Sequence, residues 1–201
     1  MKLGMVIDLL KCVGCNSCTV ACRGENGTPP GVSFHKIKKY EVGKYPEAKM
    51  KFLPMPCMHC QNAPCLKVCP TGATYRETDG RILIDYDKCI GCRACMIACP
   101  FDSRHFIWEL SNYYENCGPT PFETVKFASF TEGTVAKCTF CGERLKRGEQ
   151  PACVETCIGL ARTFGDLDDP NSEVSRLIVE HGGKQFRKEL GTDPCVFYIK
   201  G

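Results

Sequence analysis

The chain has 201 residues, which allows one or two domains, and its composition is ordinary for a globular protein except for 18 cysteines. The formal net charge is +3 and no dense block of Lys and Arg occurs, so nucleic acid is not an expected partner. No basic, apolar and small-residue export leader precedes Cys12, and no apolar run reaches the roughly 18 residues that span a bilayer. Neither a secreted disulfide protein nor a direct membrane span is therefore expected.

The first elements lead into a group of four cysteines. The apolar run 3–10 predicts a short buried strand. Residues 24–35 are expected to form a loop, and residues 36–53 a strand-like cover with solvated lysines. Repeated C-x2-C groups in a chain without an export leader indicate metal ligands rather than disulfides. The first group has spacings of two, two and three residues: Cys12, Cys15, Cys18 and Cys22.

Two further groups flank a predicted hairpin, because Asp79-Gly80 lies between two β-rich runs. The group before it has a middle gap of four residues and ends in a proline: Cys57, Cys60, Cys65 and Cys69. The group after it has the bacterial ferredoxin pattern C-x2-C-x2-C-x3-C-P: Cys89, Cys92, Cys95 and Cys99. In that pattern the first three cysteines hold one cluster and the fourth ligates the other, so Cys69 and Cys99 are expected to exchange clusters.

Residues 101–137 form a long insertion with a turn at Gly118-Pro119. Connections longer than about 15 residues usually have a function or structure of their own. Two interpretations stay open: a hairpin that covers a cluster, and an aromatic surface on which a partner docks. The aromatic residues are Phe101, Phe106, Trp108, Tyr113, Tyr114, Phe122, Phe127 and Phe130.

The last group joins a C-x2-C pair to a C-x3-C pair: Cys138, Cys141, Cys153 and Cys157. Taken alone, two such pairs could also bind zinc, but beside three clearer groups iron–sulfur is favoured. Cys117 and Cys195 lie outside the groups and are expected to be small buried side chains. His59 is expected beside the ligands or at the surface, because four thiolates already complete its group.

The tail is expected to form a helix between Pro170 and Gly182, capped by Ser172, and a closing strand at 195–199. The chain has no nucleophile–base signature, no G-x-G-x-x-G loop and no P-loop. Four groups of four cysteines fit four 4Fe–4S clusters, whose irons are saturated by protein thiolate. Oxidised clusters of roughly −2 each would bring the loaded chain to roughly −5. We therefore expect electron transfer, and no catalytic site on this chain.

Five stretches carry a resemblance to a known family: MVIDLLKCVGCNSCTVAC, PCMHCQNAPCLKVCPTGA, DYDKCIGCRACMIACPFD, KCTFCGERLKRGEQPACVETC and TFGDLDDP. Over nearly its whole length the chain resembles the four-cluster iron–sulfur subunit of the molybdopterin (DMSO reductase) oxidoreductase family. Members serve polysulfide, thiosulfate, tetrathionate, arsenate and dimethyl sulfoxide reductases. The resemblance implies an α+β fold of two bacterial-ferredoxin-like two-cluster units in one compact chain. Some relatives have tryptophan and a three-iron cluster where this chain has Cys92, so four cubes are expected here. Ile158 departs from the proline of several relatives.

The resemblance also implies a nested pairing of the groups. Groups one and four form an outer unit at 1–54 and 133–201, groups two and three form an inner unit at 55–102, and 103–132 is an aromatic-rich insertion. Spacing alone supports the inner pairing, whereas the outer pairing rests mainly on the resemblance. The implied ligand sets are Cys12, Cys15, Cys18 and Cys157; Cys22, Cys138, Cys141 and Cys153; Cys57, Cys60, Cys65 and Cys99; and Cys69, Cys89, Cys92 and Cys95.

The partners implied by the resemblance are a molybdopterin-containing catalytic subunit and a membrane quinone-reactive subunit. Electrons would pass from quinol through this chain to molybdenum, or in the reverse direction in an oxidase. The expected location is at the membrane through these partners, on the periplasmic or outer face by export with the catalytic subunit; the alternative is cytoplasmic. The alternative functions are a polyferredoxin-type subunit of a hydrogenase or formate dehydrogenase, and a zinc-bound scaffold.

Charged residues next to the ligands are candidates for tuning the clusters, because nearby charge and hydrogen bonds to sulfur set cluster potentials over about −700 to +450 mV. We hypothesise that some of them raise the potential of a nearby cluster. The alternative for each is a surface charge that points away. The six residues are Lys11, Arg23, Lys67, Lys88, Arg93 and Lys137.

Overall fold

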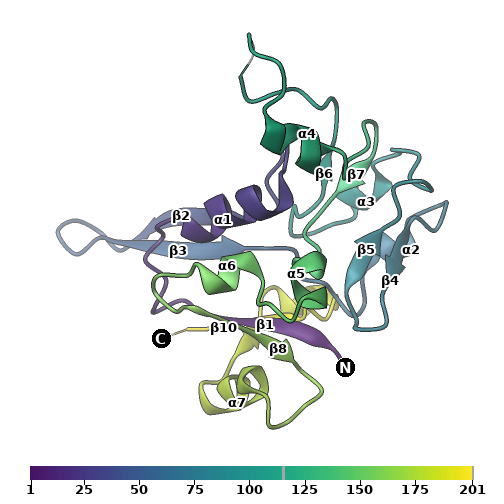
Figure 1. Cartoon of the computed structure of the whole chain (residues 1–201). Coiled ribbons are helices and arrows are strands. Elements are labelled where there is room, and N and C mark those ends of the chain that lie inside the picture. The colour runs from purple at the N-terminus through teal and green to yellow at the C-terminus, as the bar shows by residue number, and fades with distance from the viewer. Residues whose placement is uncertain (115, 201) are drawn as a thin grey trace.

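The computed structural model describes residues 1–114 and 116–200 as an α+β protein of small sheets and short helices (Figure 1). The strands are β1 (Leu3–Asp8), β2 (Lys36–Val42), β3 (Lys49–Met55), β4 (Thr74–Arg76), β5 (Ile82–Ile84), β6 (His105–Phe106), β7 (Val135–Ala136), β8 (Arg162–Asp166), β9 (Lys184–Gln185) and β10 (Val196–Ile199). The helices are α1 (Ser17–Asn26), α2 (Pro64–Lys67), α3 (Ala94–Ile97), α4 (Pro121–Phe127), α5 (Gly142–Lys146), α6 (Ala152–Glu155), α7 (Glu173–Glu180) and the 3-10 helix η1 (Lys188–Leu190).

The largest sheet has the strand order β8-β1-β10-β9. β1 pairs antiparallel with β8 and parallel with β10, so that Met5 lies opposite both Phe164 and Val196. Because side chains alternate across a strand, Met5 and Ile7 face the main core while Val6 packs beneath α7. The strand expected near the N-terminus is thus confirmed, as a central strand buried on both faces.

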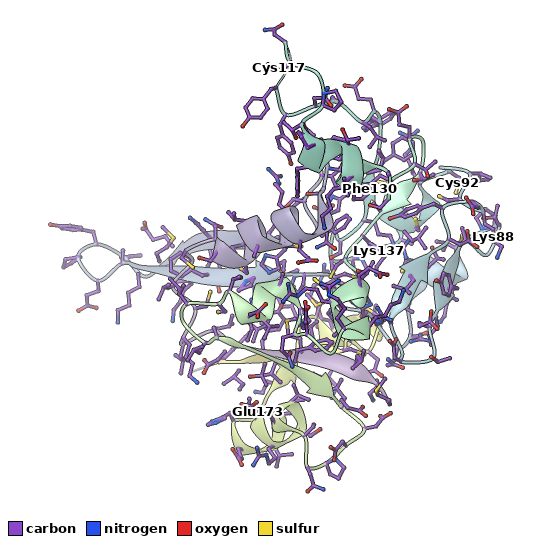
Figure 2. The ribbon with its side chains drawn as sticks, viewed as in Figure 1. Lys88, Cys92, Cys117, Phe130, Lys137 and Glu173 are labelled. Atoms are coloured by element: carbon purple, nitrogen blue, oxygen red, sulfur yellow. The ribbon has the colours of Figure 1, made fainter. Side chains whose placement is uncertain are left out.

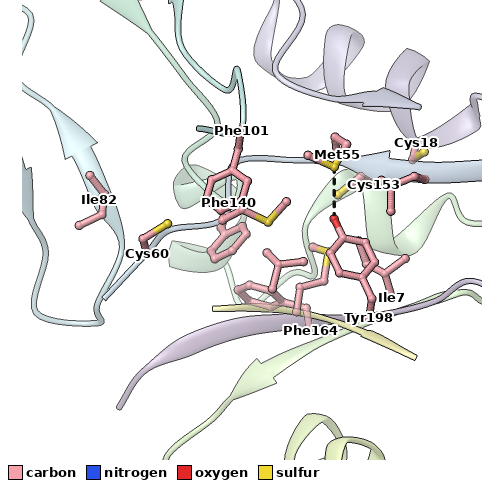
Figure 3. Packing of buried hydrophobic residues seen from close by; sticks show 14 of the residues in the cluster. Ile7, Cys18, Met55, Cys60, Ile82, Phe101, Phe140, Cys153, Phe164 and Tyr198 are labelled. Atoms are coloured by element: carbon pink, nitrogen blue, oxygen red, sulfur yellow. Dashed lines mark hydrogen bonds between the residues drawn. The ribbon is translucent and has the colours of Figure 1, made fainter. Parts of the chain in front are cut away.

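The main core lies between this sheet and the cysteine groups (Figure 3). Phe101, Phe140, Phe164 and Tyr198 are its aromatic side chains, and the buried Tyr198 hydroxyl donates to the Pro54 carbonyl at 2.7 Å. Cysteines of three groups belong to the same buried cluster: Cys18, Cys60 and Cys153. The predicted ligands are therefore part of the hydrophobic core and not an attachment to its surface.

Two hairpins form where the sequence predicts a hairpin and a strand-like cover. β4 and β5 pair antiparallel around Asp79-Gly80, with Gly80 in the left-handed region at φ 83° as this turn requires. β2 and β3 pair antiparallel and project to the left in Figure 1. Lys36, Lys38 and Lys39 of β2 are exposed, which confirms a solvated cover strand.

The insertion forms a hairpin that covers the third cysteine group. β6 and β7 pair antiparallel, and α4 lies on the segment between them at the top of Figure 1. A Cβ added to Gly91 would lie 2.0 Å from the Gly133 carbonyl oxygen, so the backbone beside β7 rests directly on this loop. The covering interpretation is confirmed; docking of a partner stays a prediction.

The tail also follows the sequence. The Ser172 hydroxyl accepts a hydrogen bond from the Ser175 amide at 3.2 Å and caps α7, whose Val174 is fully buried. β10 forms where the closing strand was expected and lies between β1 and β9 in the largest sheet.

Candidate iron–sulfur centres

Three cavities of nearly equal size each have four cysteines in their lining. Each set of four contains three cysteines close in sequence and one from a distant segment. The cavities are lined by quartet A (Cys12, Cys15, Cys18 and Cys157), quartet C (Cys57, Cys60, Cys65 and Cys99) and quartet D (Cys69, Cys89, Cys92 and Cys95).

The remaining four grouped cysteines also lie together, and we call them quartet B: Cys22, Cys138, Cys141 and Cys153. Burial, and then the like charges of the other three thiolates, raise the pKa of Cys22 well above its ordinary value. The Asn26 amide lies 3.5 Å from the Cys22 sulfur and 3.9 Å from the Cys141 sulfur. The structure thus brings together the four sets that the resemblance implied.

The first C-x2-C loop of each cysteine group has the same backbone feature. The residue before the second cysteine is in the left-handed conformation in each: Gly14 (φ 68°), His59 (φ 43°), Gly91 (φ 67°) and Phe140 (φ 54°). This conformation curls the loop so that two thiols can face one cavity. Glycine adopts it freely, whereas a residue with a Cβ needs compensating contacts.

The two residues that are not glycine supply such contacts to each other. The His59 and Phe140 rings stack with their centroids 3.8 Å apart, and each is 1% exposed. His59 Nδ1 accepts a hydrogen bond from the Ile82 amide at 3.1 Å, and burial keeps the pKa of His59 well below its ordinary value. This neutral ring lines the cavity of quartet C, as expected for a residue beside the ligands.

The chemistry of the lining fits iron–sulfur clusters. Thiolate is their preferred ligand, and each quartet supplies four. Burial raises the pKa of Cys60 to about 12, so without metal this sulfur remains protonated at neutral pH. Metal must displace such protons, which couples cluster binding to both pH and folding. Within residues 1–114 and 116–200, no group of three or more His, Cys, Asp or Glu side chains converges closely enough to hold a single ion.

The quartets lie in the order A-B-C-D. Burial raises the pKa of Cys153 in quartet B to about 11, and Cys18 in quartet A adds to the shift. Burial, and next the Cys57 thiolate of quartet C, raise the pKa of Cys138 in quartet B. Arg104 lines the cavities of both C and D. Each quartet therefore adjoins the next.

Both ends of this line reach the surface. Cys15 in quartet A and Cys92 in quartet D are exposed. Every cysteine of quartets B and C is buried or partly buried. The interior of the line is thus shielded from water, while its two ends are accessible.

The two cysteines outside the quartets differ from each other. Cys195 is 1% exposed and accepts a hydrogen bond from the Gln61 side chain at 3.0 Å, so its expected burial is confirmed. Cys117 is exposed, so the expectation of a buried side chain is wrong there. It lies in the loop before α4, too far out on the insertion to reach a core (Figure 2).

Two buried arginines beside the quartets were missed from the sequence. Arg104 and Arg162 are 2% and 6% exposed. Each follows the distant cysteine of a quartet, Cys99 or Cys157, by five residues. The sequence does contain this shared offset as a signal, but it becomes visible only when the segment that follows Cys99 is aligned with the segment that follows Cys157.

Comparison with known proteins identifies the family. Two models described as 4Fe-4S dicluster domain match the chain, one over residues 11–73 and the other over residues 48–119 and 110–167. The chain belongs to the 4Fe–4S dicluster family. The match over 110–167 contains the ambiguous fourth group, which favours iron–sulfur there over zinc. The two dicluster models together with the grouped cysteines fit four 4Fe–4S clusters.

Similar proteins in this dicluster family are named as reductase subunits. The chain is 45% identical over 208 residues to a selenate reductase subunit of Mesobacillus selenatarsenatis, covering 97% of this chain and 70% of that protein. It is 42% identical over 227 residues to the arsenate respiratory reductase iron-sulfur subunit ArrB of Shewanella sp., covering 100% and 97%. It is 39% identical over 202 residues to a tetrathionate reductase subunit of Salmonella typhimurium, covering 98% and 72%. This dicluster protein is thus an electron-transfer component of an oxidoreductase and not its catalytic chain.

Proposed function

We propose that the chain relays electrons through four 4Fe–4S clusters between a quinone-reactive membrane subunit and a molybdopterin catalytic subunit of a respiratory oxidoreductase. The observation that carries the proposal is the continuous line of four quartets, in which the exposed cysteines are Cys15 at one end and Cys92 at the other. The names of the relatives, which are reductase subunits, support a reductase complex.

The sixteen quartet cysteines are the proposed cluster ligands. A bound 4Fe–4S cluster supplies a one-electron couple. The chain's own residues hold each quartet in place, and the aromatic core excludes water from quartets B and C. Burial in a fixed, dry surrounding keeps reorganisation small as charge arrives and leaves.

The division into units is part of the proposal. We place quartets A and B in an outer unit at 1–54 and 133–201, quartets C and D in an inner unit at 55–102, and the covering insertion at 103–132. Pairing of β1 with β8 and β10 supports the outer unit, since both partners lie beyond residue 133. The β4–β5 hairpin between groups two and three supports the inner one.

The two ends of the line are the proposed contacts for the two partners. Val13, Ile158 and Leu160 are exposed beside quartet A, and Ile90 and Trp108 are exposed beside quartet D. Exposed apolar side chains are typical of protein interfaces. No helix among the described residues has the length and apolar character to cross a bilayer. We propose that these partner contacts attach the chain to the membrane, on the periplasmic or outer face.

Anaerobic purification of the native complex tests this function. The expected result is about sixteen irons per copy of this chain, four reducible clusters by EPR, and molybdenum that co-elutes with the chain. Nickel in place of molybdenum would support the hydrogenase-type alternative. A colourless, iron-free chain in its native complex would overturn the relay.

A further inference from the structure

Three cations are buried among the described residues: Arg104, Lys137 and Arg162. They are 2%, 2% and 6% exposed. None forms an ion pair with a carboxylate within residues 1–114 and 116–200. A buried charge without a counter-ion is costly, so each of them needs another source of negative charge.

Arg162 lies between quartets A and B. Its Nη2 is 3.7 Å from the Cys18 sulfur of quartet A, and its Nη1 is 3.9 Å from the Cys153 sulfur of quartet B. The guanidinium also contacts His35, whose pKa is lowered well below its ordinary value by burial and by Arg162. His35 therefore stays neutral and adds no charge at this junction.

Lys137 is buried in the middle of the molecule (Figure 2). Its ammonium group donates to the carbonyl of Ile82, which lines the cavity of quartet C, and, at 2.6 Å, to the carbonyl of Cys138 in quartet B, so it lies between these two quartets. Burial raises the pKa of Cys138 in quartet B and of Cys65 in quartet C, and the Lys137 charge opposes both shifts. Both oxygens that this ammonium group contacts belong to neutral carbonyl groups, so neither of them neutralises its charge.

Arg104 lies between quartets C and D and lines both cavities. Its Nη1 donates to the Thr74 hydroxyl at 3.0 Å, while its buried Nη2 has no hydrogen-bond partner among the described residues. Burial lowers the pKa of Arg104, but the thiolates of Cys65 and Cys95, one from each quartet, raise it overall.

One buried cation therefore lies at each junction between neighbouring quartets: Arg162 between A and B, Lys137 between B and C, and Arg104 between C and D. We propose that Arg162, Lys137 and Arg104 are shared counter-charges that each raise the potentials of two neighbouring clusters at once. This inference rests on the proposed four-cluster relay. Clusters with four thiolates are anionic and gain a further negative charge on reduction, so a cation between two of them stabilises the reduced form of both.

If a counter-charge is shared, its removal should shift the potentials of two clusters. Removal of a counter-charge that belongs to a single cluster would shift only one potential. Arg162→Gln should lower the midpoint potentials of clusters A and B, Lys137→Met those of B and C, and Arg104→Gln those of C and D. At an effective dielectric constant of about 20, removal of the charge should lower the ratio of reduced to oxidised cluster at least about tenfold at a fixed potential, for each of the two affected clusters. For a one-electron couple this is a decrease of about 59 mV in the midpoint potential. The other two clusters should be unchanged in each variant.

The measurement is an EPR-monitored redox titration of the whole complex. Arg162→Lys, Lys137→Arg and Arg104→Lys retain the charge and should retain all four potentials. Asn26→Leu is a matched control: it removes a neutral donor that approaches only quartet B, so it should shift one potential. Where a neutral variant loses clusters, its charge-retaining counterpart must keep all four; loss in both would overturn the assignment at that junction.

Two failures are distinguishable. Four transitions in the unmodified complex, with one or none displaced in each neutral variant, would overturn the shared counter-charges and leave the relay intact. Fewer than four transitions in the unmodified complex would overturn the proposed relay itself, and the shared counter-charges with it.

Discussion

At the scale of single residues, the position before the second cysteine of each loop meets one backbone requirement in two ways. In quartets A and D it is glycine, and in B and C it is an aromatic ring. A Cβ on Gly14 would lie 2.3 Å from the Phe52 ring, so the end loops are covered too closely for any side chain. In the interior of the line, His59 and Phe140 fill the space between two quartets instead. The residue type therefore follows the position of the loop in the line.

Gly91→Ala should destabilise the loop of quartet D. The new Cβ meets the Gly133 carbonyl, and the left-handed conformation adds strain on the order of 1–3 kcal/mol. The expected result is loss of about four irons per chain and of one EPR signal. Gly24→Ala is the matched control, since nothing lies within 4 Å of a Cβ there. A fully loaded Gly91→Ala protein would show that the loop has more freedom than the structure gives it.

Arg93 allows a test of exposed charge against buried charge. Its guanidinium lies 5.2 and 4.9 Å from the centroids of the Phe106 and Trp108 rings and is open to solvent. Water screens such a charge. Arg93→Gln should therefore lower only the potential of cluster D, and by less than Arg104→Gln does, in the same redox titration. Unchanged potentials would remove the tuning hypothesis for Arg93.

At the scale of elements, α4 is fixed by a capping box. The Glu123 carboxylate accepts from the Thr120 amide and the Tyr113 amide, both at 2.6 Å, and the Thr120 hydroxyl accepts from the Glu123 amide at 3.2 Å. The first amide belongs to the helix start and the second to the preceding loop. One side chain thus ties the loop of the insertion to its helix.

This tie should be lost in acid. The hydrogen bond from the Tyr113 amide, followed by those from Thr120, lowers the pKa of Glu123. A lowered folded-state pKa means that the stabilisation is complete above the unfolded value of about 4.3 and disappears as pH falls through the folded value. Hydrogen exchange should show protection of the Tyr113 and Thr120 amides falling in that window. Glu123→Ala, which has no side-chain acceptor, should lack protection at every pH; pH-independent protection in the unmodified protein would contradict this account.

Elements specified by neighbouring residues were predictable, and those specified by distant residues were not. The Asp79-Gly80 hairpin and the Ser172 cap need only local signals, and both are confirmed. The order β8-β1-β10-β9 joins residues from both ends of the chain, and the sequence contains no local signal for it.

At the scale of the whole molecule, the division into two units predicts that loss of one ligand affects clusters in one unit and not in the other. Cys95→Ser should perturb cluster D chiefly and spare the outer clusters A and B, because quartet D adjoins only C. Iron analysis and EPR of the folded, soluble variant would check this. Equal loss of all four signals would contradict the division into two units.

The sixteen grouped cysteines could be chosen from the sequence because ligand spacing is local. The buried cations between the quartets could not be chosen in this way. Of the six charged residues next to ligands in the sequence, Lys137 is buried and the others are exposed. Arg104 and Arg162 do not neighbour a ligand in sequence. Their place between quartets depends on how the cysteine arms cross, which is a property of the tertiary fold.

The position of β1 has a consequence for biosynthesis. This strand leaves the ribosome well before both of its neighbours, β8 and β10, which lie beyond residue 161. The cysteines of quartets C and D all lie between residues 57 and 99, so they are translated together while the apolar first strand still lacks its partners. Until β8 and β10 are made, Met5, Val6 and Ile7 must be covered by a chaperone or by other nascent chain. Metal loading of the nascent protein should accordingly begin at quartets C and D, with quartets A and B completed only after Cys157 has been translated.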